Sequence, residues 1–168
     1  MGASSVGKVV AHVLFVCTGN IFRSMTAEYA LRRELGAASG LLVASAGTDD
    51  YPHVVRANVS DYLRLRGIDV SAHRRRTVTR EMVVDAKLVV AMSTDHQRWL
   101  AARYGVTVPV FLEACGGACQ ALPDIEEVVL DYRTNAAAVD AHVRQTIDKI
   151  LELTPRLALR IRETLTGS

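Results

Sequence analysis

The sequence predicts an α/β fold: one domain built as a three-layer sandwich, in which a four-stranded parallel sheet is flanked by helices. Short apolar runs alternate along the chain with segments of helical periodicity, and this alternation is typical of a parallel sheet covered on both faces. The chain has 168 residues, 49% of them hydrophobic, which is enough for one substantial core but short for two. We therefore expect a single domain over residues 11–168, preceded by a flexible N-terminal tail over residues 1–10.

The expected strands are four apolar runs: His12–Val16, Leu41–Ala46, Leu88–Met92 and Val108–Leu112. Apolar residues at helical spacing predict helices over Met25–Leu35, Arg56–Arg66 and Asp95–Tyr104, each ended by a glycine. A last helix is expected to begin after Asn135 as its N-cap and to be interrupted at Pro155.

Composition excludes several classes of function. The 20 basic and 18 acidic residues give a net charge of +2 and are spread along the chain, so no nucleic-acid partner is expected. No apolar run approaches the roughly 18 residues of a membrane span, so no membrane partner is expected. Three cysteines do not make the dense, even framework of a secreted disulfide protein. We expect a cytoplasmic protein that is a monomer or a weak dimer.

The segment after the first expected strand, Cys17–Ser24, carries the strongest chemical signal. It lies between the carboxyl end of a strand and the amino end of a helix, where backbone N–H groups and the helix dipole favour an anion. Gly19 permits a tight backbone, and Arg23 adds a planar guanidinium that can bind two oxygens of a tetrahedral oxyanion. The same positive field favours the thiolate of Cys17, which then faces the anion as a nucleophile.

Each of these residues also has an ordinary structural explanation. A lone cysteine at a strand end is usually a small buried residue, and a lone arginine near a helix start is usually a solvated charge. Here Cys17 and Arg23 are separated by five residues that include Gly19 and Asn20, and Ser24 follows them. This combination, in a strand, loop and helix context, favours a phosphate-binding loop with a nucleophilic cysteine over coincidence.

The stretch VLFVCTGNIFRS closely resembles the signature of the low-molecular-weight protein tyrosine phosphatase family, and the likeness continues through VASAGT, GIDVSAHRRR and LVVAMSTDHQRWL. It implies that Cys17 is the nucleophile and forms a phosphocysteine intermediate. It implies that Arg23 and the loop hold the substrate's phosphoryl group, so no metal or cofactor is expected. The loop residues expected to bind substrate are Thr18, Gly19, Asn20, Ile21 and Phe22.

The resemblance also implies a hydrogen-bond network that supports the loop. Its expected members are Asn20, Ser24, Ser45 and His73. Ser24 can donate to the leaving thiolate when the intermediate breaks down. Apart from the resemblance, Ser45 and His73 are equally well explained as a strand-end hydroxyl and a surface histidine.

The general acid is the point at which the resemblance fails. Such an acid protonates the leaving oxygen, and the family uses an aspartate followed by proline, a pair that does not occur in this sequence. Asp124 follows the fourth expected strand, but it also fits a helix N-cap with Glu127 completing a capping box. Asp131 is followed by the aromatic Tyr132 and reproduces the family's spacing to the last helix. We therefore favour Asp131 over Asp124 as the acid.

The expected substrate is a phosphotyrosine-containing protein or a small aryl phosphate. Ile21 resembles the tyrosine phosphatases, whereas the related arginine phosphatases carry threonine at that position. Tyr51 lies where the family has an aromatic rim, and Tyr132 is a second candidate, although a tyrosine in a loop is common. Phe22 stands where many members have a second, protective cysteine.

Two other functions are compatible with the motif. Arsenate reduction on the same fold needs two further reactive cysteines, and Cys115 and Cys119 lie beyond where related reductases carry theirs. The same pair lacks the second Cys or His pair of a zinc site. A non-catalytic module that binds phospho-ligands would explain the missing Asp-Pro pair, but binding alone does not need the thiol of Cys17.

Overall fold

The computed structural model describes residues 11–165, and the tail expected over residues 1–10 lies outside the described residues. Three parallel strands form its sheet: β1 (Val13–Cys17), β2 (Val43–Gly47) and β3 (Leu88–Ala91), in the order β2-β1-β3. The apolar sequence of β1, VLFVC, explains its central position, because a strand without a polar face is stable where both of its faces are buried.

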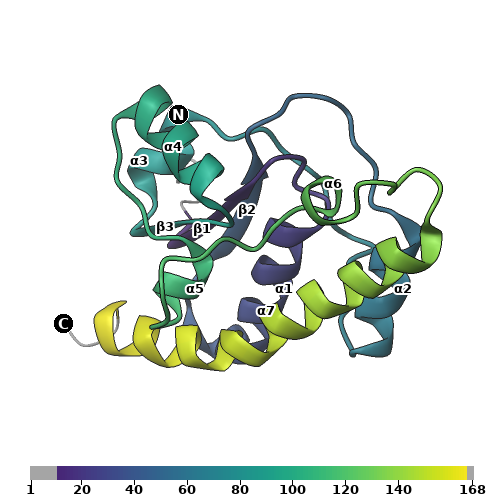
Figure 1. The fold of residues 1–168 in the computed structure, drawn as a ribbon. Helices are drawn as coiled ribbons and strands as arrows, with labels where there is room; N and C mark the ends of the chain where they lie inside the picture. Colours follow the sequence, from purple (N-terminus) through teal and green to yellow (C-terminus); the bar gives the residue numbers. More distant parts are fainter. Residues whose placement is uncertain (1–10, 166–168) are drawn as a thin grey trace, which may run out of the picture.

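Helices cover both faces of this sheet (Figure 1). On one face lie α1 (Arg23–Leu35), α2 (Ala57–Leu65) and the long α7 (Ala136–Leu165), and on the other lie α3 (Arg80–Asp85) and α4 (Thr94–Tyr104). Side chains of a strand alternate between its faces. Phe15 accordingly belongs to the core under α1 and α7, and Leu14 to the core under α3 and α4. The predicted α/β fold with a flanked parallel sheet is confirmed.

Apart from the fourth strand and the last helix, the expected strands and helices begin and end within two residues of their predicted bounds. Four short helices were not expected: η1 (Ala37–Ser39), α3, α5 (Phe111–Ala114) and α6 (Ile125–Val128). The amide N–H of Ala138 donates to Asn135 Oδ1 at 3.1 Å, so the predicted N-cap of the last helix is confirmed. Within residues 11–165, no helix is both long enough and apolar enough to span a membrane.

The expected fourth strand is wrong, because Val110 makes only an isolated parallel bridge to Ala91. The Ala91 amide donates to the carbonyl of Pro109 at 3.0 Å, but Pro109 has no N–H with which to continue a ladder. The chain then turns directly into α5, and Phe111 packs its ring 6.1 Å from that of Phe15. The apolar run therefore reflects burial of a helix start, and the described sheet has three strands.

The expected interruption at Pro155 is also wrong, because α7 continues through it to Leu165. A proline inside a helix removes one hydrogen bond and costs about 3 kcal/mol. Beyond the proline, Leu157, Ala158 and Ile161 still bury their side chains in the core. That burial offsets the cost, since each large apolar side chain contributes roughly 1.5–3 kcal/mol.

Candidate active site

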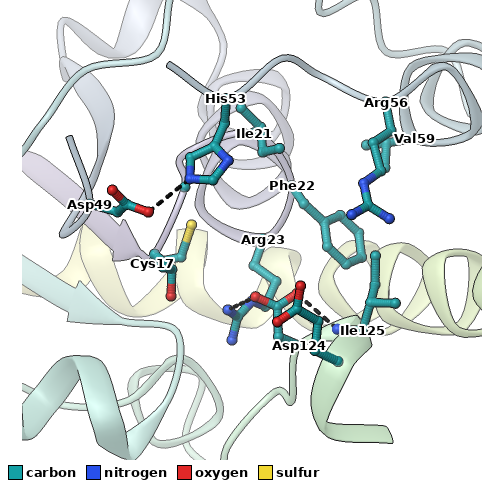
Figure 2. Close-up of a pocket in the computed structure, with 13 residues that line it drawn as sticks. Cys17, Ile21, Phe22, Arg23, Asp49, His53, Arg56, Val59, Asp124 and Ile125 are labelled. Carbon is teal, nitrogen blue, oxygen red and sulfur yellow. Dashed lines mark hydrogen bonds and ion pairs between the residues drawn. The ribbon is translucent and has the colours of Figure 1, made fainter. Parts of the chain in front are cut away.

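A cleft of about 230 Å³ opens at the carboxyl end of β1, where the loop between β1 and α1 lies (Figure 2). This is the edge of a parallel sheet at which ligands collect. Helix α1 begins at Arg23, and its N-cap residue Phe22 has no polar side chain to occupy the first-turn amides. The lining residues are Cys17, Thr18, Gly19, Ile21, Phe22, Arg23, Asp49, His53, Arg56, Val59, Asp124, Ile125 and Glu126.

Cys17 is held at the base of this cleft by the hydroxyl of Ser24. The Cys17 Sγ atom lies 2.9 Å from Ser24 Oγ, and only 3% of the Cys17 surface is exposed. Asn20 Nδ2 donates to Ser24 Oγ at 3.0 Å and to Ser45 Oγ at 2.7 Å. The structure thus brings Cys17, Asn20, Ser24 and Ser45 together in one buried network.

Asn20 adopts a left-handed conformation with φ of 57°, which is unfavourable for most residues but tolerated by asparagine. Its neighbours fix that conformation. His73 Nε2 donates to the Asn20 carbonyl at 2.7 Å, and the Arg76 amide donates to Asn20 Oδ1 at 3.0 Å. Burial lowers the pKa of His73, which favours its neutral form. Ser45 continues the network by donating to the Glu28 carboxylate.

Gly47 is a site residue that the sequence argument did not single out. Residues Cys17 and Gly47 are paired across β1 and β2, so the end of β2 lies directly under the loop. A Cβ at Gly47 would lie 2.4 Å from the Thr18 carbonyl oxygen, and glycine is required for so close an approach. A glycine within the strand sequence VASAG was the available signal.

Arg23 is buried, with its guanidinium turned toward the segment before α6. Its Nη1 donates to the Leu122 carbonyl at 3.0 Å, and its Nη2 lies 2.6 Å from Asp124 Oδ2. The other carboxylate oxygen of Asp124 accepts the Ile125 amide at 2.8 Å, and Glu127 completes a capping box. The structure therefore brings Asp124 to the cleft while also giving it the capping position that the sequence allowed.

Asp131 lies apart from this group, outside the residues that line the cleft. Its side chain is exposed and accepts from Asn135 Nδ2 at 3.0 Å. Tyr132 is half-buried against the core, and its hydroxyl accepts from Arg133 Nε at 3.1 Å. Tyr51 is 63% exposed and does not line the cleft itself. It contacts two lining residues: its ring centroid lies 4.9 Å from that of His53, and its amide donates to Asp49 Oδ1 at 2.7 Å.

Three further groups support the cleft and were missed from the sequence. Asp49 Oδ2 lies 2.9 Å from His53 Nε2, and the pKa of Asp49 is lowered by the Tyr51 amide and then by His53. Arg75 Nε donates to the Gly19 carbonyl at 3.1 Å, which ties the loop to the segment after β2. The run of three arginines in GIDVSAHRRR was the visible signal for the last contact.

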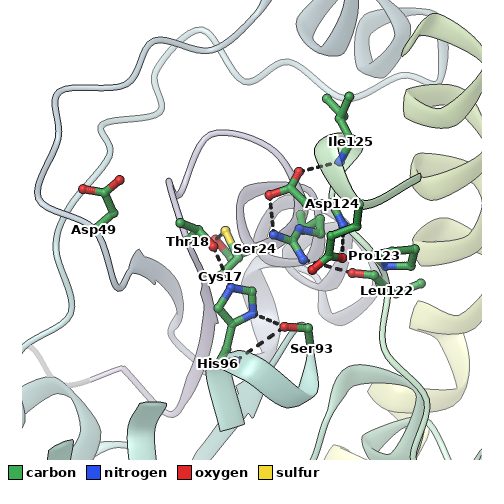
Figure 3. A network of polar contacts seen from close by, with 12 residues as sticks. Cys17, Thr18, Ser24, Asp49, Ser93, His96, Leu122, Pro123, Asp124 and Ile125 are labelled. Atoms are coloured by element: carbon green, nitrogen blue, oxygen red, sulfur yellow. Dashed lines mark hydrogen bonds and ion pairs between the residues drawn. The ribbon is translucent and has the colours of Figure 1, made fainter. Parts of the chain in front are cut away.

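The third group is a buried histidine on α4 (Figure 3). His96 Nε2 lies 2.8 Å from Thr18 Oγ1, and His96 Nδ1 lies 2.8 Å from Ser93 Oγ. Burial, followed by the charge of Arg23, lowers the pKa of His96 to about 4. His96 is therefore neutral near pH 7.

Neither of the other two cysteines lines the cleft. Cys115 is buried, and this burial raises the pKa of its thiol to about 12. Cys119 is exposed. Within residues 11–165, no group of three or more His, Cys, Asp or Glu side chains is arranged to hold a metal ion.

The comparison with known families agrees with this geometry. The sequence profile described as "Low molecular weight phosphotyrosine protein phosphatase" matches residues 12–165. The chain belongs to that family. A solved low molecular weight protein tyrosine phosphatase from T. tengcongensis superposes with a TM-score of 0.72 at 26% identity, covering 89% of this chain and 99% of that one.

Two relatives within the family have different substrates in their names. The low molecular weight protein-tyrosine-phosphatase Etp of Escherichia coli (strain K12) is 36% identical over 85 residues, which cover 50% of this chain and 55% of Etp. A protein-arginine-phosphatase of Bacillus subtilis is 33% identical over 101 residues, covering 55% of this chain and 63% of the relative. The alignments thus span less than two thirds of the length of either relative.

Proposed function

We propose that this member of the phosphatase family hydrolyses phosphotyrosine or a small aryl phosphate through a phosphocysteine intermediate. One observation carries the proposal: Cys17, Arg23 and Asp124 line a single cleft whose wall includes Ile21 and Phe22. These three polar groups supply a nucleophile, an oxyanion clamp and a proton donor. The apolar wall suits the ring of an aryl leaving group.

In the first step, the Cys17 thiolate attacks phosphorus and the bond between phosphorus and the leaving oxygen breaks. The first-turn amides of α1 and the fork of Arg23 stabilise the charge on the phosphoryl oxygens. In the second step, water attacks phosphorus, its proton passes to the Asp124 carboxylate that the first step leaves behind, and the bond to sulfur breaks. Ser24 Oγ, 2.9 Å from Cys17 Sγ, stabilises the departing thiolate by donating to it.

Geometry favours Asp124 over Asp131 as the general acid, which reverses our preference from the sequence. Asp124 is in the cleft and in contact with the side chain of Arg23, whereas Asp131 is not among the lining residues. Binding of a phosphoryl group draws the Arg23 fork onto the phosphoryl oxygens and releases the Asp124 carboxyl. That carboxyl, in its protonated form, then donates to the leaving oxygen.

The observation that favours the aryl substrate is the position of Ile21 in the lining of the cleft that holds Cys17. Its side chain lines the cleft together with Phe22, Val59 and Ile125. A planar ring gains more from such an apolar surface than a charged guanidinium does.

Phosphoarginine hydrolysis is the second candidate. The 33% identity to the arginine phosphatase of Bacillus subtilis supports it, and so do Asp49 and Glu126, whose carboxylates line the cleft and can pair with a guanidinium. Arsenate reduction has less support, because Cys115 has a raised pKa and lies outside the cleft.

A panel of matched peptides carrying phosphotyrosine, phosphoserine or phosphoarginine, assayed for released phosphate with chelator present, tests the proposal. We expect the highest kcat/KM on phosphotyrosine and no loss of activity on chelation, because the loop amides and Arg23 take the place of a cation. A preference for phosphoarginine selects the second candidate. Phosphate binding without turnover of any peptide would favour the non-catalytic module.

A further inference from the structure

A series of three hydrogen-bonded polar side chains, two of them buried, connects α4 to Thr18 in the phosphate-binding loop (Figure 3). Ser93 is the N-cap of α4 and accepts the His96 amide at 3.4 Å. His96 lies between Ser93 and Thr18, with one ring nitrogen 2.8 Å from each hydroxyl. Ser93 and His96 are 4% and 5% exposed, whereas Thr18 is exposed and lines the cleft.

The hydrogen atoms in this series of hydrogen-bonded side chains can be placed by asking which donors have acceptors. Ser93 is buried, and among the described residues the acceptor within reach of its hydroxyl is His96 Nδ1. A buried hydroxyl without an acceptor is costly, so Ser93 donates to Nδ1. A neutral imidazole carries one hydrogen, which must then be on Nε2.

The direction of the second hydrogen bond follows from the first. His96 Nε2–H donates to Thr18 Oγ1, so the hydroxyl hydrogen of Thr18 cannot point back to the ring. In Figure 3, His96 lies below the side chain of Thr18, which leaves the hydroxyl hydrogen free to turn into the cleft.

We propose that Ser93 and His96 are positioning residues that orient Thr18 at the start of the phosphate loop, so that the Thr18 hydroxyl donates to an oxygen of the bound oxyanion. The inference rests on the proposed function, since it concerns the same anion site. It adds a donor to the loop amides and Arg23, and it gives a role to α4, a helix none of whose residues is among those that line the cleft.

The charges around His96 keep the hydrogen-bond directions fixed. Burial and the charge of Arg23 oppose protonation of the ring. The charges of Asp124 and Asp95 favour protonation, but their effect is smaller. A protonated ring would have hydrogens on both nitrogens and could no longer accept from Ser93. A neutral ring preserves the order of donors from Ser93 to Thr18.

Titration calorimetry with inorganic phosphate and with orthovanadate tests the proposal, because binding can be measured without turnover. Thr18→Val removes the hydroxyl with little change in shape, and Thr18→Ser keeps it. His96→Leu removes the ring donor, whereas His96→Gln retains an amide N–H near the position of Nε2. Gln97→Leu is the matched control, because Gln97 lies on the same helix and bonds instead to the Val108 carbonyl at 2.7 Å.

We expect Thr18→Val and His96→Leu each to weaken the binding of both anions by roughly tenfold, which is the effect of one lost charge-assisted hydrogen bond. The double variant should lose no more anion affinity than either single variant, because both substitutions break the same series of hydrogen bonds. Thr18→Ser, His96→Gln and Gln97→Leu should bind as wild type does.

Unchanged anion affinity in Thr18→Val would overturn the proposal, and so would additive losses in the double variant. If His96→Leu does not fold, as a thermal melt would show, the comparison of Thr18→Val with Thr18→Ser decides alone. Failure of the wild-type protein to bind either anion would overturn this inference and the proposed function together. Binding without peptide turnover would reject the enzyme and leave the inference standing.

Discussion

Arg23 Nη2 lies 2.6 Å from Asp124 Oδ2, and this ion pair joins the phosphate loop to the N-terminus of α6 across the cleft. The arginine is 3% exposed and the aspartate 38%, so the pair is buried on one side and open to substrate on the other. The same carboxylate also caps α6 through the Ile125 amide. Substitutions at Asp124 therefore test catalysis and stability together.

Asp124→Asn should lower kcat for phosphotyrosine by about a hundred- to ten-thousand-fold, the usual contribution of a general acid. The kcat for nitrophenyl phosphate should fall much less, because its leaving group needs no proton. Asparagine keeps the N-cap, so the thermal midpoint should change little through capping. Asp131→Asn is the matched control, and its rates should remain near wild type. The reverse pattern would restore Asp131 as the acid.

Cys17→Ser should abolish turnover while phosphate still binds, because a hydroxyl without an adjacent base is a poor nucleophile. The test is steady-state release of phosphate alongside calorimetry on the same preparation. Turnover near wild type in this variant would exclude the phosphocysteine route.

Arg23→Lys should lower kcat/KM by roughly a hundredfold or more, since lysine cannot hold two phosphoryl oxygens and also loses the contact to the Leu122 carbonyl. The measurement is kcat/KM on nitrophenyl phosphate, with the melting temperature as a check on folding. A loss confined to stability would contradict the clamp role.

Most of the loop could be predicted because its chemistry is local. Cys17, Arg23 and Ser24 come from one segment, and its position between a strand and a helix fixes where they lie. His96 could not be found in this way, because it reaches Thr18 across 78 positions of sequence. The residues around His96 have the pattern of an ordinary amphipathic helix.

The errors have a common cause in local patterns that tertiary packing overrides. An apolar run from Val108 predicted a strand, but Pro109 cannot donate and Phe111 is buried at a helix start. The choice between Asp131 and Asp124 is a different case. Counting residues to the last helix favoured Asp131, whereas our proposal of Asp124 rests on its ion pair with Arg23, which counting cannot show. Proline at position 155 predicted a break that the burial of Leu157 and Ile161 prevents.

His96→Gln should flatten the pH dependence of stability between about pH 4 and pH 6.5. The ring stays neutral in the folded protein down to a pKa of about 4 but binds a proton near pH 6.5 when unfolded. Wild type therefore loses stability as the pH falls through this window, by about 3 kcal/mol in all. Urea unfolding at several pH values measures it. An equal slope in the variant would contradict a neutral buried His96.

Pro155→Ala should raise the free energy of unfolding by roughly 1–3 kcal/mol, because alanine restores a helical N–H and removes the ring's clash with the preceding turn. Position 155 is exposed, so the change leaves no cavity. A rise of several degrees in the melting temperature is expected, with kcat on nitrophenyl phosphate unchanged. A lower melting temperature would mean that α7 needs a bend at this point.

Helix α7 is the last of the described elements to leave the ribosome, yet it packs along α1, the helix whose first residue, Arg23, lines the cleft. His142 on α7 also donates to the Pro123 carbonyl at 3.2 Å, next to Asp124. During synthesis, Cys17 and its loop therefore emerge early, and the support for both walls of the cleft emerges late. A nascent chain therefore carries Cys17 long before the cleft around it can form, and the cleft is fully supported only once this helix has been translated.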